Sequence, residues 1–358
     1  MTSCPGSAVK STALTYVWEC SYLGAVSTAV DPRYFKLPAY TFNASQTYDL
    51  AVTVTDKAGY SNYQSTEVVV GQSDLVAIID GGDRIVGMGD ALYLDGTNSY
   101  DPDTGDSTGL TFDWSCAVLS DDEGACNATL ATNHNDYETL KHYGEGIYEF
   151  SATIFKLYRG VWRNATASVI ITIIDVVVPP VAISALTTAK SNPSDRLVLT
   201  ATVGPSTYAV DATWSLDSGS LAVSGSDLAD VATTSLTNSV AAGVTATLYL
   251  VLPADTLTPG STYAFLLEAT CASSCSATDG YSKLTVDVNA PPSSGTVAVT
   301  PSEGVVLSTG FEYECTGWVD DVSDLPLLYA STRPAPLRYS SLDSSSHVEH
   351  DRVTSLVT

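Results

Sequence analysis

The chain has 358 residues, which exceeds the size of a single sandwich core and predicts two to four domains. Apolar residues make up 44% of it and charged residues only 15%, a composition typical of a folded chain and not of a disordered one. With 40 acidic and 15 basic residues, the formal net charge of −25 disfavours nucleic acid and anionic membrane surfaces as partners.

Strands that end near a tryptophan recur along the chain. Their sequences are LTYVWEC at 14–20, LTFDWSC at 110–116 and VDATWSL at 210–216. The alternation of side chains around each tryptophan is typical of a strand with one buried face. The three tryptophans, Trp18, Trp114 and Trp214, are 96 and 100 residues apart. We interpret each as a core residue that fills the space between two sheets.

A second repeated strand opens with a tyrosine and is followed by a hairpin partner. Copies start at residues 47, 147 and 262, with Tyr48, Tyr148 and Tyr263 in equivalent places. A period of about 100 residues fits one immunoglobulin-like β-sandwich per repeat, since about seven short strands and their turns use that length. The tyrosines occupy the position of a tyrosine corner, in which the hydroxyl group bonds to the backbone just upstream.

The seven cysteines indicate an oxidising compartment. Cys116 and Cys126 bracket an acidic loop, and Cys271 and Cys275 bracket a short turn, so both pairs predict local disulfides. Cys4 and Cys20 are further disulfide candidates, and Cys315 is the cysteine left over for an intermolecular pair.

Three N-glycosylation sequons agree with that compartment. They are Asn43-Ala-Ser, Asn127-Ala-Thr and Asn164-Ala-Thr, whereas Asn192-Pro-Ser is excluded by its proline. We expect N-linked glycans on the first three asparagines.

Two long stretches resemble known extracellular modules. LYLDGTNSYDPDTGDSTGLTFDWSC at 92–116 is similar to the strand–turn–strand of polycystic-kidney-disease (PKD) repeats and of the receptor-for-egg-jelly (REJ) module. PPSSGTVAVTPSEGVVLSTGFEYECTGWVDDVSDLPLLY at 291–329 resembles the REJ segment, with its Pro-Pro opening and Cys-x-Gly-Trp. The WDFGDG motif of typical PKD repeats is replaced here by Trp-x-Cys. The resemblance implies extracellular, non-catalytic modules used in adhesion, sensing or fibrous surface structures.

The predicted fold class is all-β, with tandem Ig-like antiparallel β-sandwiches of PKD/REJ type and incomplete modules at both ends. The expected parts are a partial Ig-like module at 1–72, a PKD-like module at 73–176, an Ig-like or REJ-type module at 177–288, the start of a further REJ-type module at 289–330, and a Ser/Pro-rich tail at 331–358.

Acidic groups in turns are candidates for a weak calcium site, because Ca²⁺ takes six to eight oxygen ligands. The candidates are Asp101 and Asp103 with Asp106, Asp121-Asp122-Glu123, and Asp320-Asp321. Turn chemistry explains the Asp-Pro-Asp sequence equally well.

Motifs of catalysis are missing from the sequence, which has no nucleophile elbow, HExxH or phosphate loop. The four histidines, His134, His142, His347 and His350, stand in polar surroundings, and His347-Val-Glu-His350 offers too few ligands for a metal. We therefore expect neither an enzyme nor a metal cofactor.

The partial modules suggest self-association. An incomplete sandwich exposes a sheet edge that can template another chain. Strands within 290–330, with the segment 353–357, would complete the first module of a neighbour, and Cys315 would pair with Cys4 or Cys20 across the contact. Repetition of this head-to-tail contact gives a filament.

The alternative is that the sequence is an excerpt of a longer ectodomain of a polycystin- or REJ-like receptor, which binds a glycan or a protein ligand. In both cases we expect a structural or adhesive glycoprotein at the cell surface or outside the cell. The most apolar run, 169–183, is broken by Asp175 and Pro179-Pro180 and is too short to span a bilayer, so we expect no membrane insertion.

Overall fold

The chain is all-β, as the sequence predicted. The computed structural model describes residues 14–22, 26–38, 41–88, 90, 92–119, 126, 137–140, 144–219, 227–273, 277–305, 308–321, 324 and 327. Its regular structure consists of strands and, among these residues, one short helix, α1 (Leu228–Val231).

The chain divides into two compact units. Unit 1 comprises residues 1–75, 100–110 and 155–164, and unit 2 comprises residues 76–99, 111–154 and 165–358. The boundaries expected at residues 72, 176, 288 and 330 define a finer division, which stays a prediction.

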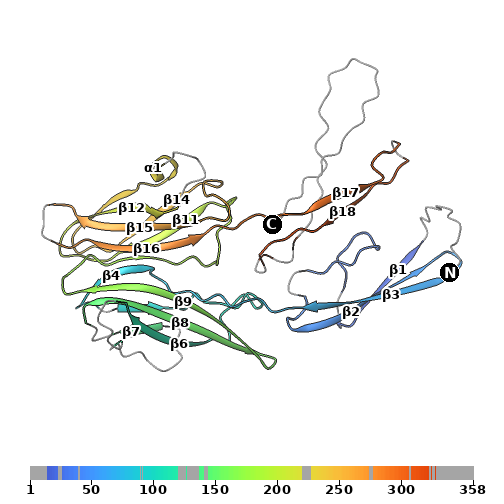
Figure 1. Ribbon diagram of the computed structural model, residues 1–358, viewed down its shortest axis with the longest axis horizontal. Helices are drawn as coiled ribbons and strands as arrows, with labels where there is room; N and C mark the ends of the chain where they lie inside the picture. The colour runs from blue at the N-terminus through green and yellow to red at the C-terminus, as the bar shows by residue number, and fades with distance from the viewer. Residues whose placement is uncertain are drawn as a thin grey trace, which may run out of the picture. The chain divides into compact units, whose positions relative to one another are not determined.

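The first unit contains an antiparallel sheet of three strands in the order β1-β2-β3 (Figure 1). The strands are β1 (Thr15–Cys20), β2 (Gln46–Thr55) and β3 (Ser61–Val70). A tight turn joins β2 to β3, in which the Asp56 carboxylate accepts hydrogen bonds from the backbone N–H groups of Ala58 and Tyr60, both at 2.9 Å. Both β1 and β3 are edge strands of this sheet.

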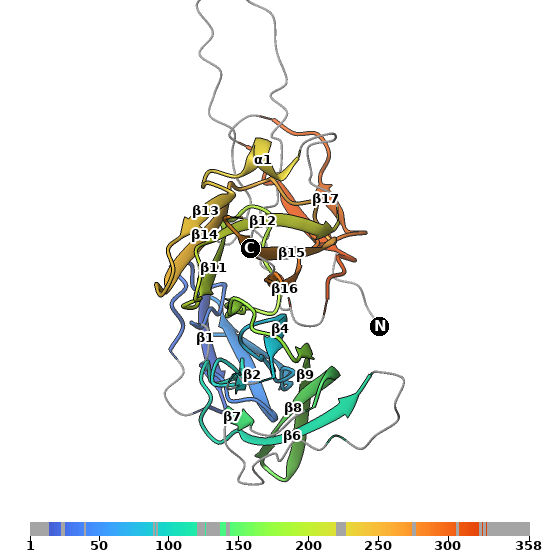
Figure 2. The ribbon, with the colours of Figure 1, turned by 90° about the vertical axis from the view of Figure 1, so that its left-hand side faces the viewer.

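An eight-stranded sheet is the largest element of the structure. The strand order is β13-β12-β15-β16-β4-β9-β8-β6, and the part from β12 to β6 can be followed in Figure 2. Their bounds are β4 (Asp83–Gly87), β6 (Thr111–Val118), β8 (Gly146–Tyr158), β9 (Val161–Ile174), β12 (Val210–Ser218), β13 (Thr237–Val240), β15 (Thr262–Cys271) and β16 (Gly280–Asp287).

Smaller sheets complete the second unit. A three-stranded antiparallel sheet supplies buried residues to the same core cluster as β12, β15 and β16. Its strands are β10 (Val181–Ile183), β11 (Leu197–Val203) and β14 (Ala246–Leu252). Two pairs are separate, β5 (Leu92–Asp95) with β7 (Tyr137–Leu140), and β17 (Thr296–Thr300) with β18 (Glu312–Thr316).

Two of the three repeated tryptophans are core residues. Trp214 is 1% exposed and belongs to the core cluster to which two sheets contribute, which confirms its predicted place between sheets, and Trp114 is 7% exposed. Trp18 is only half-buried, and its ring packs against Phe35 with centroids 5.5 Å apart. Its indole N–H donates to the Pro32 carbonyl at 2.9 Å. Trp18 therefore lies against a loop of its own unit and lacks the full burial of its two counterparts.

All three repeated tyrosines form tyrosine corners. Tyr48, Tyr148 and Tyr263 are buried, and each hydroxyl group bonds to backbone four or five residues upstream. The Tyr148 hydroxyl donates to the Gly144 carbonyl at 3.0 Å, and the Tyr263 hydroxyl accepts from the Thr258 N–H at 2.9 Å. The sequence prediction is confirmed, since each tyrosine fixes the loop that leads into its strand.

Strand β4 joins the two halves of the large sheet. It pairs in parallel with β9 on one side and antiparallel with β16 on the other. Gly82, just before β4, has φ of +61°, and a Cβ at this position would collide with the carbonyl oxygen of Lys283 in β16. This close backbone approach requires glycine.

A fully buried serine anchors the junction. The Ser282 hydroxyl in β16 donates to the Gly81 carbonyl at 2.8 Å and accepts from the Ile183 N–H at 3.0 Å. Close by, the Asp80 carboxylate accepts from the Ala185 N–H at 2.6 Å. Because buried backbone groups without partners cost free energy, these side chains hold the segments before β4 and after β10 in one arrangement.

The first prediction concerns this serine. Ser282→Ala removes the side-chain partner of the Gly81 carbonyl and the Ile183 N–H, and we expect the free energy of unfolding to fall by about 2 kcal/mol. Chemical denaturation of the whole chain measures it. Ser168→Ala, which removes an exposed hydroxyl bonded to Ser151, is the matched control and should change stability by less than about 0.5 kcal/mol. Equal effects of the two variants would contradict the role of Ser282.

Candidate functional site

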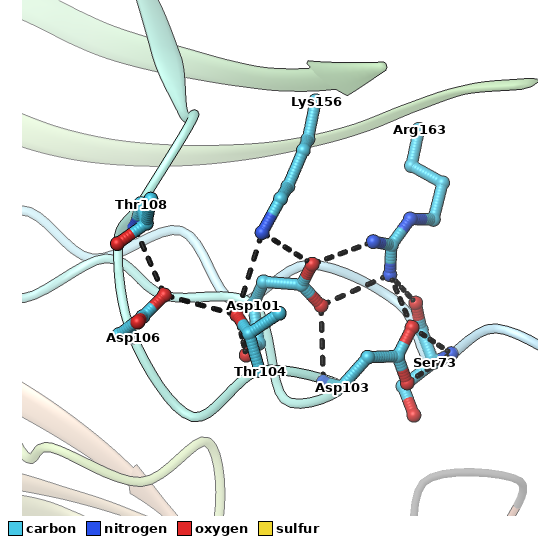
Figure 3. A network of polar contacts seen from close by, with 8 residues as sticks. All are labelled: Ser73, Asp101, Asp103, Thr104, Asp106, Thr108, Lys156 and Arg163. Atoms are coloured by element: carbon cyan, nitrogen blue, oxygen red, sulfur yellow. Dashed lines mark hydrogen bonds and ion pairs between the residues drawn. The ribbon is translucent and has the colours of Figure 1, made fainter. Parts of the chain in front are cut away.

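A cluster of charged side chains lies within the first unit, where the turn of residues 100–110 meets the end of the β8–β9 hairpin (Figure 3). At its centre is Asp101, which is only 1% exposed. A buried carboxylate needs partners, because desolvation of an unpaired charge is costly.

Two basic side chains meet this carboxylate. Arg163 forms a fork, with Nη2 2.6 Å from Oδ2 and Nη1 3.1 Å from Oδ1 of Asp101. The Lys156 ammonium lies 2.8 Å from the same Oδ2. Arg163 also binds Asp103, at 2.9 Å. Lys156 and Arg163 are each 11% exposed, so the cluster is a shielded, charge-balanced network of two acids and two bases.

The hairpin places the two bases side by side. Its turn consists of Arg159 and Gly160, both with positive φ, as in a two-residue type I′ turn. Counting back from the turn, Lys156 and Arg163 are cross-strand neighbours on one face.

The acidic turn owes its shape to side-chain-to-backbone bonds. Asp101 accepts from the Asp103 N–H at 3.0 Å through Oδ1, and Asp106 accepts from the Thr108 N–H at 3.0 Å. Gly105 has φ of +74° and donates to the Asp101 carbonyl at 2.8 Å. This is the turn chemistry that Asp and Gly favour.

The same cluster fixes the chain between β3 and β4. The Ser73 N–H donates to Asp103 at 3.1 Å, and Arg163 Nη1 donates to the Ser73 carbonyl at 2.6 Å. The network therefore holds three segments that are distant in the sequence.

The protonation of Asp101 follows from these contacts. Burial by itself would raise the pKa of Asp101, but hydrogen bonds from Arg163 and Lys156 and from the Asp103 backbone hold the pKa below its ordinary value. The pKa of Asp106 is also lowered, by its bonds to Thr108 and Thr104. Asp101 is thus ionised near neutral pH and matched by its basic neighbours.

Several of the carboxylates expected to bind calcium form ion pairs with basic side chains instead. In the cluster, Asp101 and Asp103 pair with Arg163. In the second unit, Asp321 lies 2.5 Å from the Lys190 ammonium. Lys190 also binds Asp324 at 2.9 Å, and its pKa is raised chiefly by its bond to Asp321. Over the part of the chain that is described, no three His, Cys, Asp or Glu residues are grouped to hold a metal ion.

The predicted disulfide candidates differ in their state. A disulfide joins Cys116 to Cys126, and Cys271 is also disulfide-bonded. Cys20 and Cys315 are free, half-buried thiols. The pairing expected of Cys20, with Cys4 or with Cys315 of a neighbouring chain, stays a prediction.

Two of the three sequons are described, and both Asn43 and Asn164 are exposed. Other predicted residues fall outside the described part of the chain. They are Cys4, Asp121, Asp122, Glu123, Asn127, His134, His142, Cys275, His347, His350 and the tail 331–358.

The second unit contains a cavity of about 380 Å³ near the junction of β4 and β10. Its wall includes Arg84, which is 7% exposed and donates to the carbonyls of Gly82 and Tyr93 at 3.0 and 2.8 Å. Burial lowers the pKa of Arg84, an effect that Asp80 and Asp83 oppose. The cavity combines an apolar wall with a few polar groups, as small-ligand sites do.

The family of the chain follows from a comparison over its length. The REJ domain model matches residues 7–356. The chain belongs to the REJ domain family. PKD-like modules are not separately matched, so that part of the resemblance stays an expectation.

Solved structures similar to this REJ domain are distant. Escherichia coli alpha-2-macroglobulin in its native conformation is 10% identical over 71% of this chain and 20% of that chain, with a TM-score of 0.26. Human protocadherin-24 EC1-2 is 14% identical over 46% of this chain and 82% of that chain, with a TM-score of 0.25. The N-terminal four Ig domains of Dscam1 isoform 6.44 are 13% identical over 90% of this chain and 80% of that chain, with a TM-score of 0.23.

The REJ domain spans only a fifth of the alpha-2-macroglobulin chain that it matches. The likeness to these structures concerns the β-rich fold alone. Within the described residues, the REJ domain has no helix with the length and apolar character that crossing a bilayer demands.

Sequence reasoning missed the two bases of the cluster. It identified Asp101 and Asp103 by their turn, but Lys156 and Arg163 lie more than fifty residues away. Their symmetrical placement about Arg159-Gly160 was the one available signal, because residues equidistant from a two-residue turn pair across a hairpin.

The second prediction tests the cluster. Asp101→Asn leaves Lys156 and Arg163 without their shared charge, and we expect the free energy of unfolding to fall by about 3 kcal/mol at pH 7. Denaturant unfolding measures it. Asp106→Asn, at an exposed position of the same turn, is the control and should cost less than about 1 kcal/mol. Similar losses in both variants would show that the turn alone, and not the ion pairs, stabilises this region.

The third prediction concerns pH. The pKa of Asp101 is lower in the folded chain than in the unfolded chain, so its stabilising effect is complete above the unfolded pKa and is lost as the pH falls through the folded pKa. We expect the difference in free energy of unfolding between wild type and Asp101→Asn to shrink as the pH drops below about 4. Denaturant unfolding between neutral and acidic pH measures this difference, and a difference that stays constant would contradict the assignment.

Proposed function

We propose that this REJ domain is a non-catalytic, extracellular module with a structural or adhesive role. The observation that carries the proposal is the sheet shared by the two halves of unit 2, in which β4 pairs with both β9 and β16. In this proposal the continuous sheet, with the buried Ser282 at its junction, keeps the two halves of unit 2 in a fixed arrangement, as a structural module requires.

Two further features support a place outside the cell. The Cys116–Cys126 disulfide persists in an oxidising compartment, and the sequon residues Asn43 and Asn164 are exposed to glycosylation. Membership of the REJ family fits the same location.

The test of location and modification uses the chain in its own cells. A tagged chain should appear at the cell surface or in the medium, carry glycans at Asn43 and Asn164, and retain the Cys116–Cys126 disulfide under non-reducing mass spectrometry. A chain found only in the cytosol, with reduced cysteines and no glycan, would overturn the proposal.

A second candidate function is self-association through open strands. The edge strand β3 is exposed along residues 61–67, including Tyr63 at 57%. All five side chains of β17 are exposed as well, with Val297 at 40% and Val299 at 37%. An exposed edge offers unpaired backbone groups. We propose that the β17–β18 hairpin of one copy adds to the β3 edge of another, and that repetition of this contact builds a filament.

Sedimentation and negative-stain electron microscopy of the purified chain test this contact. We expect concentration-dependent oligomers or filaments, and Val297→Lys with Val299→Lys should shift them to monomers by placing charges in the contact. Val198→Lys, at a valine that is 37% exposed in β11, is the matched control. A wild-type chain that stays monomeric at high concentration would end the filament proposal.

The alternative function is that of a receptor ectodomain for a glycan or protein ligand. The cavity beside Arg84 favours it, because a buried arginine and an apolar wall are features of a small-ligand site. Binding of glycans on an array, lost on Pro180→Trp, which fills the cavity wall, would support this alternative over self-association.

A further inference from the structure

The outer face of the β8–β9 hairpin exposes an unusual tryptophan. The sequence has five tryptophans, and Trp162 is 64% exposed while Trp114 and Trp214 are buried. Trp18 and Trp318 are half-buried. Covering a large exposed apolar ring removes its area from water, and such rings become candidate contact sites where they form a contiguous patch with other apolar side chains.

The hairpin register determines which side chains surround this ring. The two-residue turn Arg159-Gly160 makes Leu157 the cross-strand neighbour of Trp162 and Phe155 the neighbour of Asn164. Side-chain bonds farther along β8 and β9 fit this register. Thr153 bonds to Thr166 at 2.9 Å, and Ser151 bonds to Ser168 at 2.8 Å.

One face of the hairpin therefore carries Phe155, Leu157, Trp162 and Asn164, and the opposite face carries Lys156 and Arg163 of the charged cluster. The alternation of exposed and less exposed residues along β9 agrees with this division. Leu157 is 51% exposed, so the apolar surface beside Asn164 is accessible.

The sequence gives Asn164 a specific occupant. Residues 162–166 read Trp-Arg-Asn-Ala-Thr, a sequon with a tryptophan two residues before its asparagine. Since side chains two residues apart share a strand face, a sugar attached to Asn164 would start beside the Trp162 ring. Asn43, by contrast, has Thr41 in the equivalent place, so it lacks such a ring.

The chemistry of the sugar suits this surface. One face of an N-acetylglucosamine ring presents C–H groups, which pack against the electron-rich face of an indole as other positively polarised groups do. Contact removes apolar area of Trp162 and Leu157 from water while the hydroxyl groups stay solvated.

We propose that Asn164 carries an N-linked glycan whose first N-acetylglucosamine packs on Trp162 and covers the outer face of the hairpin. In the reaction, the amide nitrogen of Asn164 bonds to C1 of the sugar and loses a proton, and the lipid-linked pyrophosphate of the oligosaccharide donor leaves. The inference rests on the proposed function to the extent that the chain must meet this donor in the secretory pathway.

A thermodynamic cycle tests the contact. Wild type, Asn164→Gln, Trp162→Ala and the double variant are secreted from eukaryotic cells behind a heterologous leader, and site occupancy is measured by peptide mass spectrometry. Loss of the glycan through Asn164→Gln should lower the Tm by about 2 °C more when Trp162 is present than when it is replaced by alanine. This is the size of shift expected from the free energy of one aromatic contact. Trp162→Phe should keep much of this coupling.

Controls separate the contact from general effects. Val161→Ala shortens a side chain on the opposite face, 51% exposed against 64% for Trp162, and should leave the coupling unchanged. The same four chains made in bacteria, without glycan, should show no coupling. An unoccupied Asn164 in the secreted wild type, or equal Tm shifts in both backgrounds, would overturn the inference. Failure of the proposed extracellular location would appear only in the chain's own cells and would leave this cycle intact.

Discussion

The pairing of β4 with two partners is the constraint on which the second unit depends. Because β4 is parallel to β9 and antiparallel to β16, strands that belong to different sequence repeats share one sheet. Gly82 allows the backbones to approach, and Ser282 satisfies the backbone groups that the approach buries. The segments on either side cannot then separate without breaking buried hydrogen bonds.

The charged cluster of unit 1 plays a corresponding part by a different interaction. Asp101 organises a turn through its backbone and, through its carboxylate, binds two bases from a hairpin that is remote in the sequence. Such a network is sensitive to the loss of one member, because the remaining charges stay buried. One face of the hairpin thus serves internal structure, and the other is available for a glycan.

Particular elements show how far the sequence could predict this architecture. Tyr148 and Tyr263 were placed correctly as corner residues, since a tyrosine corner is a local bond to backbone a few residues away. Trp114 and Trp214 were placed correctly because alternation identifies a buried face. Trp18 has the same local pattern and yet stays half-buried, because burial also requires a covering layer, which alternation within a strand does not report.

The sequence by itself determined the β-rich class, the repeated unit, the turn at Asp101 and the sequon at Asn164, since these depend on residues close together in the chain. Only the tertiary structure decided that β4 pairs with β16 and that Lys156 and Arg163 bind the carboxylate of Asp101. The physical reason is that strand order and charge partners are chosen by packing between distant segments, and the free energy of that packing is not a property of any local pattern.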